Sequence, residues 1–171
     1  WIGQMTDWMK EKSGQEGLEA ESKFRIWCEG RGNTLYDPPE KMNINDHIDF
    51  IIYNKRGERY TVDIKGLKRI GRSGNRQSEW TWVEFANVKG KRGWLYGKAD
   101  YIIFEHQNGW IYVESDDLKG FAERRVKRDY FAETPQDAKY RIYQREGRQD
   151  EIALAEIKEL IKIGRFIDDK K

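Results

Sequence analysis

The chain has 171 residues, of which 37% are hydrophobic and 36% are charged, and its formal net charge at pH 7 is only +2. This length suits about one domain with a sizeable core, and no apolar run approaches the roughly 20 residues of a membrane-spanning helix. The single cysteine, Cys28, excludes a disulfide framework, and the absence of a basic-then-apolar leader after Trp1 agrees with it in favouring a reducing cytoplasm.

The first predicted elements lie near the N-terminus. Residues 1–13 form a polar lead-in that could contain a short helix, and residues 14–30 predict an amphipathic helix that ends at Gly30 and Gly32. At about 100° per residue, one face of this helix should pack on the core and carries Gly17, Ala20, Phe24, Trp27 and Cys28. We therefore interpret Cys28 as a packed, unreactive thiol.

A β-hairpin is predicted after the chain break at Pro38-Pro39. Its first strand covers residues 49–53, its turn residues 54–57, and its second strand ends at Lys65. Pairing Tyr53 with Glu58 would place Asp49 across from Val62, within one residue of Asp63.

The rest of the chain predicts a mixed α/β domain with a central mixed sheet. Two basic loops are expected at residues 66–78 and 87–97. The other expected elements are strands over 80–85, 100–105 and 110–114, a turn at Asn108-Gly109, a helix from Ser115, an extended segment over 140–144, and a strand running into a helix over 152–163.

Two carboxylates and a lysine are expected to converge at one end of the sheet. Strand side chains alternate between faces, so Asp63 and Lys65 share a face, and the hairpin brings Asp49 beside them. Carboxylate oxygens are the ligands that Mg²⁺ prefers, and the backbone carbonyl of Ile64 could add a third oxygen. A metal there could polarise a phosphodiester and acidify a water, while Lys65 could orient or deprotonate that water or neutralise the transition state.

A further carboxylate could come from the first helix. Glu21 lies about 60° from Phe24 at the border of the apolar face, whereas Glu19 lies about 140° away on the opposite side. We therefore choose Glu21 over Glu19 as a residue that could face the site. A glutamate at such a border is also a common surface group.

Basic residues are concentrated after the candidate site. Residues 65–98 contain nine basic and two acidic side chains, and a second basic cluster follows at residues 124–128. Such patches suit a polyanion, although solvated loops are an alternative. The candidate nucleic-acid contacts are Lys68, Arg69, Arg72, Arg76, Lys89, Lys91, Arg92 and Lys98.

Several other residues leave two interpretations open. Trp94 and Tyr96 could contact DNA from the second basic loop, whereas Trp80 and Trp82 are more typical of packing than of base stacking. His47 could bind metal or phosphate, or could serve only its own loop.

The ordered set Gly17-Leu-Glu-Ala-Glu21, Asp49 and Asp63-Ile-Lys65 resembles the PD-(D/E)XK nuclease superfamily, and is most similar to Holliday-junction resolvase-like and phage-encoded members. The resemblance covers about residues 14–114 and leaves 115–171 as a C-terminal extension. It implies a restriction-endonuclease-like core in which Glu21, Asp49 and Asp63 bind metal and Lys65 serves catalysis. Ile48 replaces the usual proline, and Asp63 replaces the commoner glutamate.

The resemblance also implies a Mg²⁺-dependent endonuclease that cuts branched DNA, with Mn²⁺ as a substitute and no small-molecule cofactor. Members of this kind act as homodimers in a prokaryotic or phage-infected host cytoplasm. The alternatives are a sequence-specific restriction-like enzyme, an RNA endonuclease, or a catalytically silent nucleic-acid-binding module. The apolar residues of the last segment could form the dimer interface or close the core of one chain: Ile152, Leu154, Ile157, Leu160 and Ile161.

Overall fold

The computed structural model describes residues 12–171, so the lead-in expected over residues 1–13 lies almost wholly outside the described part. Within that part, no helix is both long and apolar enough to cross a bilayer.

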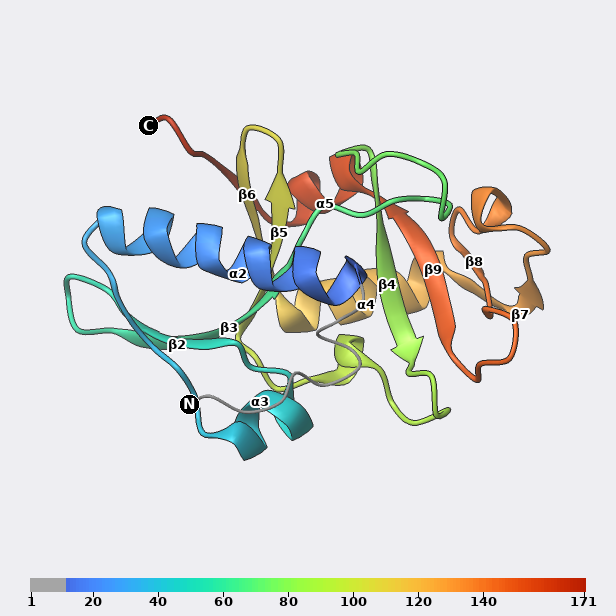
Figure 1. Cartoon of the computed structure of the whole chain (residues 1–171), viewed down its shortest axis with the longest axis horizontal. Coiled ribbons are helices and arrows are strands. Elements are labelled where there is room, and N and C mark those ends of the chain that lie inside the picture. Colours follow the sequence, from blue (N-terminus) through green and yellow to red (C-terminus); the bar gives the residue numbers. More distant parts are fainter. Residues whose placement is uncertain (1–11) are drawn as a thin grey trace.

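A six-stranded mixed sheet forms the centre of the molecule, as the sequence predicts (Figure 1). Its strand order is β1-β2-β3-β5-β6-β10, and every neighbouring pair is antiparallel except β3 and β5. The strands span Thr34–Tyr36 (β1), Phe50–Tyr53 (β2), Arg59–Lys65 (β3), Tyr101–His106 (β5), Gly109–Glu114 (β6) and Arg165–Asp168 (β10). β3 has a partner strand on each side, and its residues 61–64 are buried, which includes side chains on both faces.

One face of the sheet is covered by α2 (Lys12–Gly30), which crosses in front of it in Figure 1. The predicted apolar stripe is the buried one: Ala20, Phe24 and Cys28 pack in one cluster with Val62 and Ile64 of β3. Phe24 is fully buried, and burying such a side chain contributes about 1.5–3 kcal/mol. Burial also raises the pKa of the Cys28 thiol to about 12, which keeps it protonated and unreactive at neutral pH.

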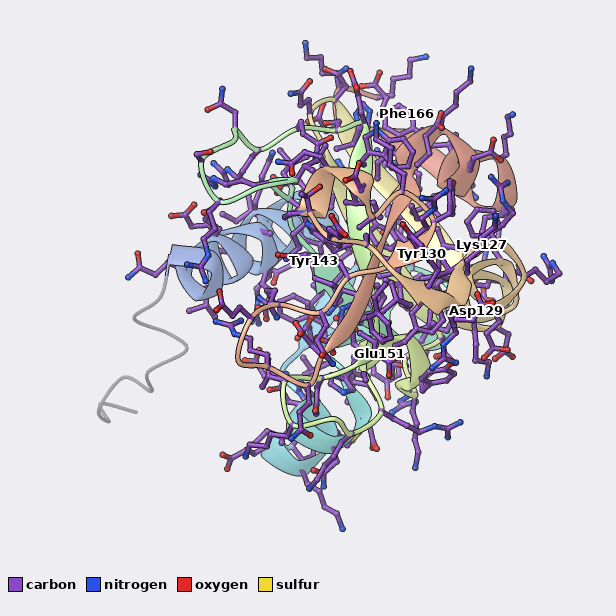
Figure 2. The ribbon with its side chains drawn as sticks, turned by 90° about the vertical axis from the view of Figure 1, so that its right-hand side faces the viewer. Lys127, Asp129, Tyr130, Tyr143, Glu151 and Phe166 are labelled. Atoms are coloured by element: carbon purple, nitrogen blue, oxygen red, sulfur yellow. The ribbon has the colours of Figure 1, made fainter. Side chains whose placement is uncertain are left out.

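Two small sheets lie beside the central sheet, at the right of Figure 1. The first pairs β4 (Trp80–Ala86) with β9 (Glu151–Glu156) in antiparallel fashion, and the second pairs β7 (Lys127–Phe131) with the short β8 (Arg141–Ile142). Figure 2 views this side, with Lys127 and Tyr130 on β7 and Glu151 at the start of β9. Residues 115–171 thus pair with the rest of the fold through β9 and β10.

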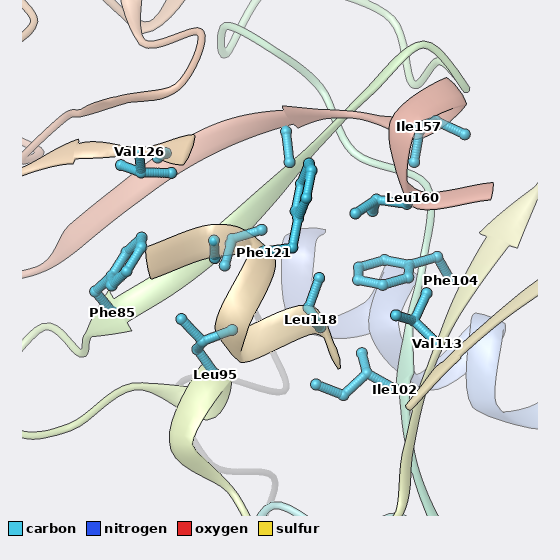
Figure 3. Packing of buried hydrophobic residues seen from close by; sticks show 14 of the residues in the cluster. Phe85, Leu95, Ile102, Phe104, Val113, Leu118, Phe121, Val126, Ile157 and Leu160 are labelled. Atoms are coloured by element: carbon cyan, nitrogen blue, oxygen red, sulfur yellow. The ribbon is translucent and has the colours of Figure 1, made fainter. Parts of the chain in front are cut away.

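The second face of the central sheet packs in a larger cluster, shown in Figure 3. There Leu118 and Phe121 of α4 (Ser115–Arg125) pack with Phe104 of β5. The 3-10 helix η1 (Trp94–Tyr96) and α5 (Ile157–Ile163) complete this layer. The apolar residues offered as a possible dimer interface are buried in this chain, except for the partly buried Ile161: Ile152, Leu154, Ile157 and Leu160. The four buried residues therefore belong to the core of one chain, which is the second of the two interpretations offered for them.

Most predicted elements match the structure, and those that were missed are short or polar. The strand running into a helix over 152–163 and the turn at Asn108-Gly109 are both confirmed. The missed elements carry too little apolar periodicity to be recognised: β1, α3 (Glu40–Asp46), β7, β10 and the 3-10 helices η1 and η2 (Pro135–Asp137). No residue of α3 is buried, and every residue of β7 is exposed.

The predicted hairpin register is wrong by one residue. Tyr53 pairs with Arg59, not Glu58, and Phe50 pairs with Val62. Asn54 closes the longer loop, because its backbone N–H donates to the Glu58 carbonyl at 3.0 Å. Asp49 lies just before β2, and its backbone N–H donates to the carbonyl of Val62, the residue that pairs with Phe50.

Candidate active site

The carboxylates of Asp49 and Asp63 meet at the end of β3. The backbone N–H of Asp49 donates to the Val62 carbonyl at 2.8 Å, and its Oδ2 accepts the Ile64 backbone N–H at 2.7 Å. These two bonds orient the Asp49 side chain along β3. The Asp49 and Asp63 carboxyl groups lie within hydrogen-bonding reach of each other when one is protonated.

Lys65 lies beside this pair, as the strand alternation predicts. Its Nζ is 3.1 Å from Asp63 Oδ1, and both side chains are largely buried, with exposed fractions of 17% for Lys65 and 4% for Asp63. The second carboxylate oxygen, Asp63 Oδ2, is buried and receives no hydrogen bond from the described residues. A buried carboxylate oxygen without a donor is costly unless a cation or proton satisfies it.

The acids of the site hold their protons unusually tightly. Burial, followed by the charge of Asp63, raises the pKa of Asp49 to about 8. Burial, followed by the charge of Asp49, raises the pKa of Glu21 to about 8, and burial likewise raises the pKa of Asp63 against the attraction of Lys65. Carboxylates buried together cannot all ionise easily without added positive charge.

Glu21 reaches the site because the chain after β3 runs close to α2. A Cβ added at Gly66 would lie 3.1 Å from the Ala20 Cβ, so the backbone passes directly beside this turn of the helix. The Glu21 charge acts on the site in this way, but the structure gives it no hydrogen bond or ion pair to Asp49, Asp63 or Lys65. Within residues 12–171, no three His, Cys, Asp or Glu side chains are grouped closely enough to hold a metal ion.

The donor set still fits a divalent cation. Asp49 and Asp63 supply hard oxygen ligands, and Asp63 Oδ2 is buried without a hydrogen bond from any described residue when the site is ionised. Glu21 lies at the border of this pair and would have to move toward it to become a ligand. Ile64 is a central residue of β3 opposite Ile103, and its contact in the site is its N–H, which donates to Asp49.

Two residues for which the sequence leaves two interpretations open, Trp94 and His47, lie near Lys65. The ring of Trp94 lies with its centroid 4.4 Å from Lys65 Nζ, and so faces the site. His47 ends α3 in a left-handed conformation (φ 55°), and its backbone N–H donates to Met42. Burial and then the charge of Lys65 lower the pKa of His47, so neutral imidazole is favoured beside the site.

Of the eight candidate nucleic-acid contacts, five are paired within the protein or partly buried, and three are exposed without such a contact to residues 12–171. Arg69 and Arg76 both form ion pairs with Glu16, at 3.2 and 3.1 Å, and Lys98 lies 3.7 Å from Asp46. Lys68 is partly buried, and burial followed by the charge of Lys65 lowers its pKa to about 8. Arg92 lies over the Tyr96 ring at 4.6 Å. The remaining exposed side chains are Arg72, Lys89 and Lys91.

The strand tryptophans pack within the fold, as the sequence favours. Trp80 and Trp82 lie against a small cluster around Ala132, Ala138 and Leu154, and Trp82 Nε1 donates to the Arg69 carbonyl at 2.8 Å. Their rings are therefore engaged with the protein.

Comparison with known proteins gave no match, since no family model, curated protein or solved structure matched the chain.

Proposed function

We propose that this chain is a divalent-metal-dependent endonuclease that hydrolyses DNA phosphodiester bonds, within a restriction-endonuclease-like fold. The observation that carries the proposal is the convergence of the partly buried Asp49 with the buried Asp63, whose Oδ1 lies 3.1 Å from Lys65 Nζ. A merely structural ion pair between Asp63 and Lys65 would not require a second carboxylate beside it. Perturbed acids of this kind are typical of functional sites.

Each residue has a distinct proposed role. Asp49 and Asp63, with Glu21 at their border, would hold Mg²⁺ or Mn²⁺, which supplies Lewis acidity toward a phosphodiester oxygen. The Ile64 backbone keeps Asp49 in place through its 2.7 Å hydrogen bond. The Lys65 ammonium stabilises the negative charge that grows on the phosphoryl oxygens, or orients the attacking water.

DNA is the proposed substrate because exposed cations follow the site along the chain. Arg72, Lys89 and Lys91 are free to contact backbone phosphates without reading base sequence. We propose branched DNA as the preferred form, cut by a homodimer, because two symmetric strands need two cuts. This preference comes from the resemblance to resolvase-like nucleases.

The test compares wild type with Asp63→Asn and Lys65→Ala on a four-way junction, a flap and a linear duplex, each with Mg²⁺ or EDTA. Wild type with Mg²⁺ should cut the junction best, and each substitution should slow cleavage by about 100-fold or more, as for loss of a principal catalytic group. Asp116→Asn and Lys162→Ala are matched controls, because their charges are exposed and should leave cleavage unchanged.

Each alternative predicts a different result. Equal cleavage by wild type, Asp63→Asn and Lys65→Ala would refute the assigned site. Equal cutting of all three DNAs would remove only the preference for branches, and cleavage at one duplex sequence would favour a restriction-like enzyme. Cleavage of RNA in a parallel assay would favour an RNA endonuclease, whereas binding without metal-dependent cleavage would identify a silent binding module.

A further inference from the structure

We propose that Trp94 is a positioning residue whose indole ring holds the Lys65 ammonium against the Asp63 carboxylate. The catalytic consequence rests on the proposed nuclease function, but the position of the ammonium can be measured without any DNA. The sequence alone placed Trp94 in a basic loop as a possible DNA contact.

The Lys65 ammonium has two close partners, a carboxylate and an aromatic ring. Asp63 Oδ1 is 3.1 Å from Nζ on one side, and the Trp94 ring centroid is 4.4 Å from Nζ on another. Only 17% of the Lys65 side chain is exposed, so little water competes with these contacts. A cation near an aromatic face is attracted by the ring quadrupole, and this attraction strengthens when the cation is desolvated.

Trp94 is itself held from three directions. Its ring packs edge-on against Phe104, with centroids 6.2 Å apart, and Phe104 is the β5 residue paired with Lys65. Its backbone N–H donates to Glu84 Oε1 at 3.2 Å. A Cβ at the preceding Gly93 would lie only 2.4 Å from the Glu84 carbonyl oxygen, so the loop lies directly on β4. The indole therefore packs against the core, on a loop that lies close against β4.

This arrangement limits what the flexible lysine can do. A lysine side chain has a flexible four-carbon stem, and restricting it to one conformation costs conformational entropy. If the aromatic ring restricts the lysine conformation when the protein folds, this entropy is not lost again each time that substrate reacts. The Trp94 ring also keeps the ammonium from extending into solvent, where it could no longer act at the end of β3.

The direct test is spectroscopic and uses the intact protein without DNA. In ¹H–¹³C spectra of protein with labelled lysines, the Lys65 side-chain protons nearest the ring should resonate upfield because of the indole ring current. This shift should disappear in Trp94→Leu and persist in weaker form in Trp94→Phe. Assignment comes from Lys65→Ala, and thermal unfolding shows that each variant is folded.

A second lysine-tryptophan pair supplies a matched control. Lys139 Nζ lies 5.0 Å from the Trp80 ring centroid, in a different part of the fold. Trp80→Leu should therefore remove the shift of Lys139 and keep that of Lys65, while Trp94→Leu should do the reverse. A Lys65 resonance that is unshifted in wild type, or that is unmoved by Trp94→Leu, would overturn the proposal.

The functional measurement separates positioning from DNA contact. In single-turnover cleavage, Trp94→Leu should lower the rate at saturating DNA about tenfold with unchanged DNA affinity, and Trp94→Phe should recover most of the rate. Weaker DNA binding with an unchanged saturating rate would instead make Trp94 a DNA-stacking residue and refute its positioning role. If wild type cuts no nucleic acid, the nuclease proposal fails, while the lysine spectra still decide the position of Lys65.

Discussion

At the scale of single residues, the site stores unfavourable electrostatics that a cation would relieve. Asp49, Asp63 and Glu21 all bind protons more tightly in the fold than ordinary carboxyl groups do. Lys65 offsets part of the negative charge, but one ammonium cannot balance three carboxylates. The stability of the metal-free protein should therefore depend on pH in the neutral range. Ordinary carboxyl groups titrate well below this range and give no such dependence.

The first consequence is a fall in stability as pH rises. The pKa of Asp49 goes from an ordinary 3.8 to about 8 in the fold, so the folded state binds the proton more tightly than the unfolded state. Its stabilising contribution is complete below the unfolded value and is lost as pH rises through about 8. The Tm in EDTA should decrease between pH 5 and pH 8, and Mg²⁺ should restore most of it at pH 8.

A neutral substitution isolates the contribution of this residue. Asp49→Asn removes the titrating group, so its Tm in EDTA should fall less between these pH values and should respond less to Mg²⁺. Identical pH slopes for wild type and Asp49→Asn would contradict the assignment of the raised pKa to Asp49.

At the scale of elements, the hairpin and the crossover between β3 and β5 build the site. The existence of the hairpin strands follows from their apolar residues and from the turn between them. The shared face of Asp63 and Lys65 follows from the alternation of side chains along β3. The register does not follow, because Asn54 can close loops of different length and the side-chain contacts that choose between them come from elsewhere in the fold. The role of Trp94 was hidden for a similar reason: its partner, Lys65, is distant in the chain.

A glycine substitution tests how closely the crossover is packed. Gly93→Ala would place a Cβ 2.4 Å from the Glu84 carbonyl oxygen, where only backbone movement can make room. The free energy of unfolding should fall by about 1–3 kcal/mol, as for other overpacking changes. Urea titration measures this, with Gly30→Ala as the control because no atom lies within 4 Å of the added Cβ.

A loss of stability by Gly30→Ala equal to that of Gly93→Ala would show that the close approach at Glu84 is not the cause. Loss of the Lys65 ring-current shift in folded Gly93→Ala is also expected, because the indole would move with its loop.

At the scale of the whole molecule, two hydrophobic clusters hold the sheet from either face. The amphipathic pattern of residues 14–30 predicts the α2 cluster closely, since Ala20, Phe24 and Cys28 are the buried residues. The other cluster could not be foreseen as a unit. It draws on strands and helices from residues 83 to 160, and sequence periodicity identifies each element without saying which elements meet.

The α2 cluster should contribute strongly to global stability. Phe24→Ala removes a fully buried ring that packs edge-on against Trp110, with centroids 5.1 Å apart. The free energy of unfolding should fall by about 3–5 kcal/mol in a denaturant titration. Ile26→Ala on the same helix is the control, because Ile26 is 75% exposed and its loss should change stability by less than about 0.5 kcal/mol.

The parallel pairing of β3 with β5 has a consequence for how the protein is made. Every proposed metal ligand and Lys65 itself precede residue 66, yet the strand and the indole that flank Lys65 come after it. Closing residues 66–100 into a crossover costs chain entropy before the parallel contacts form. A growing chain that has left the ribosome only as far as β3 therefore carries the acids and the lysine without their later neighbours. The proposed site is complete only once the second half of the sheet has been synthesised.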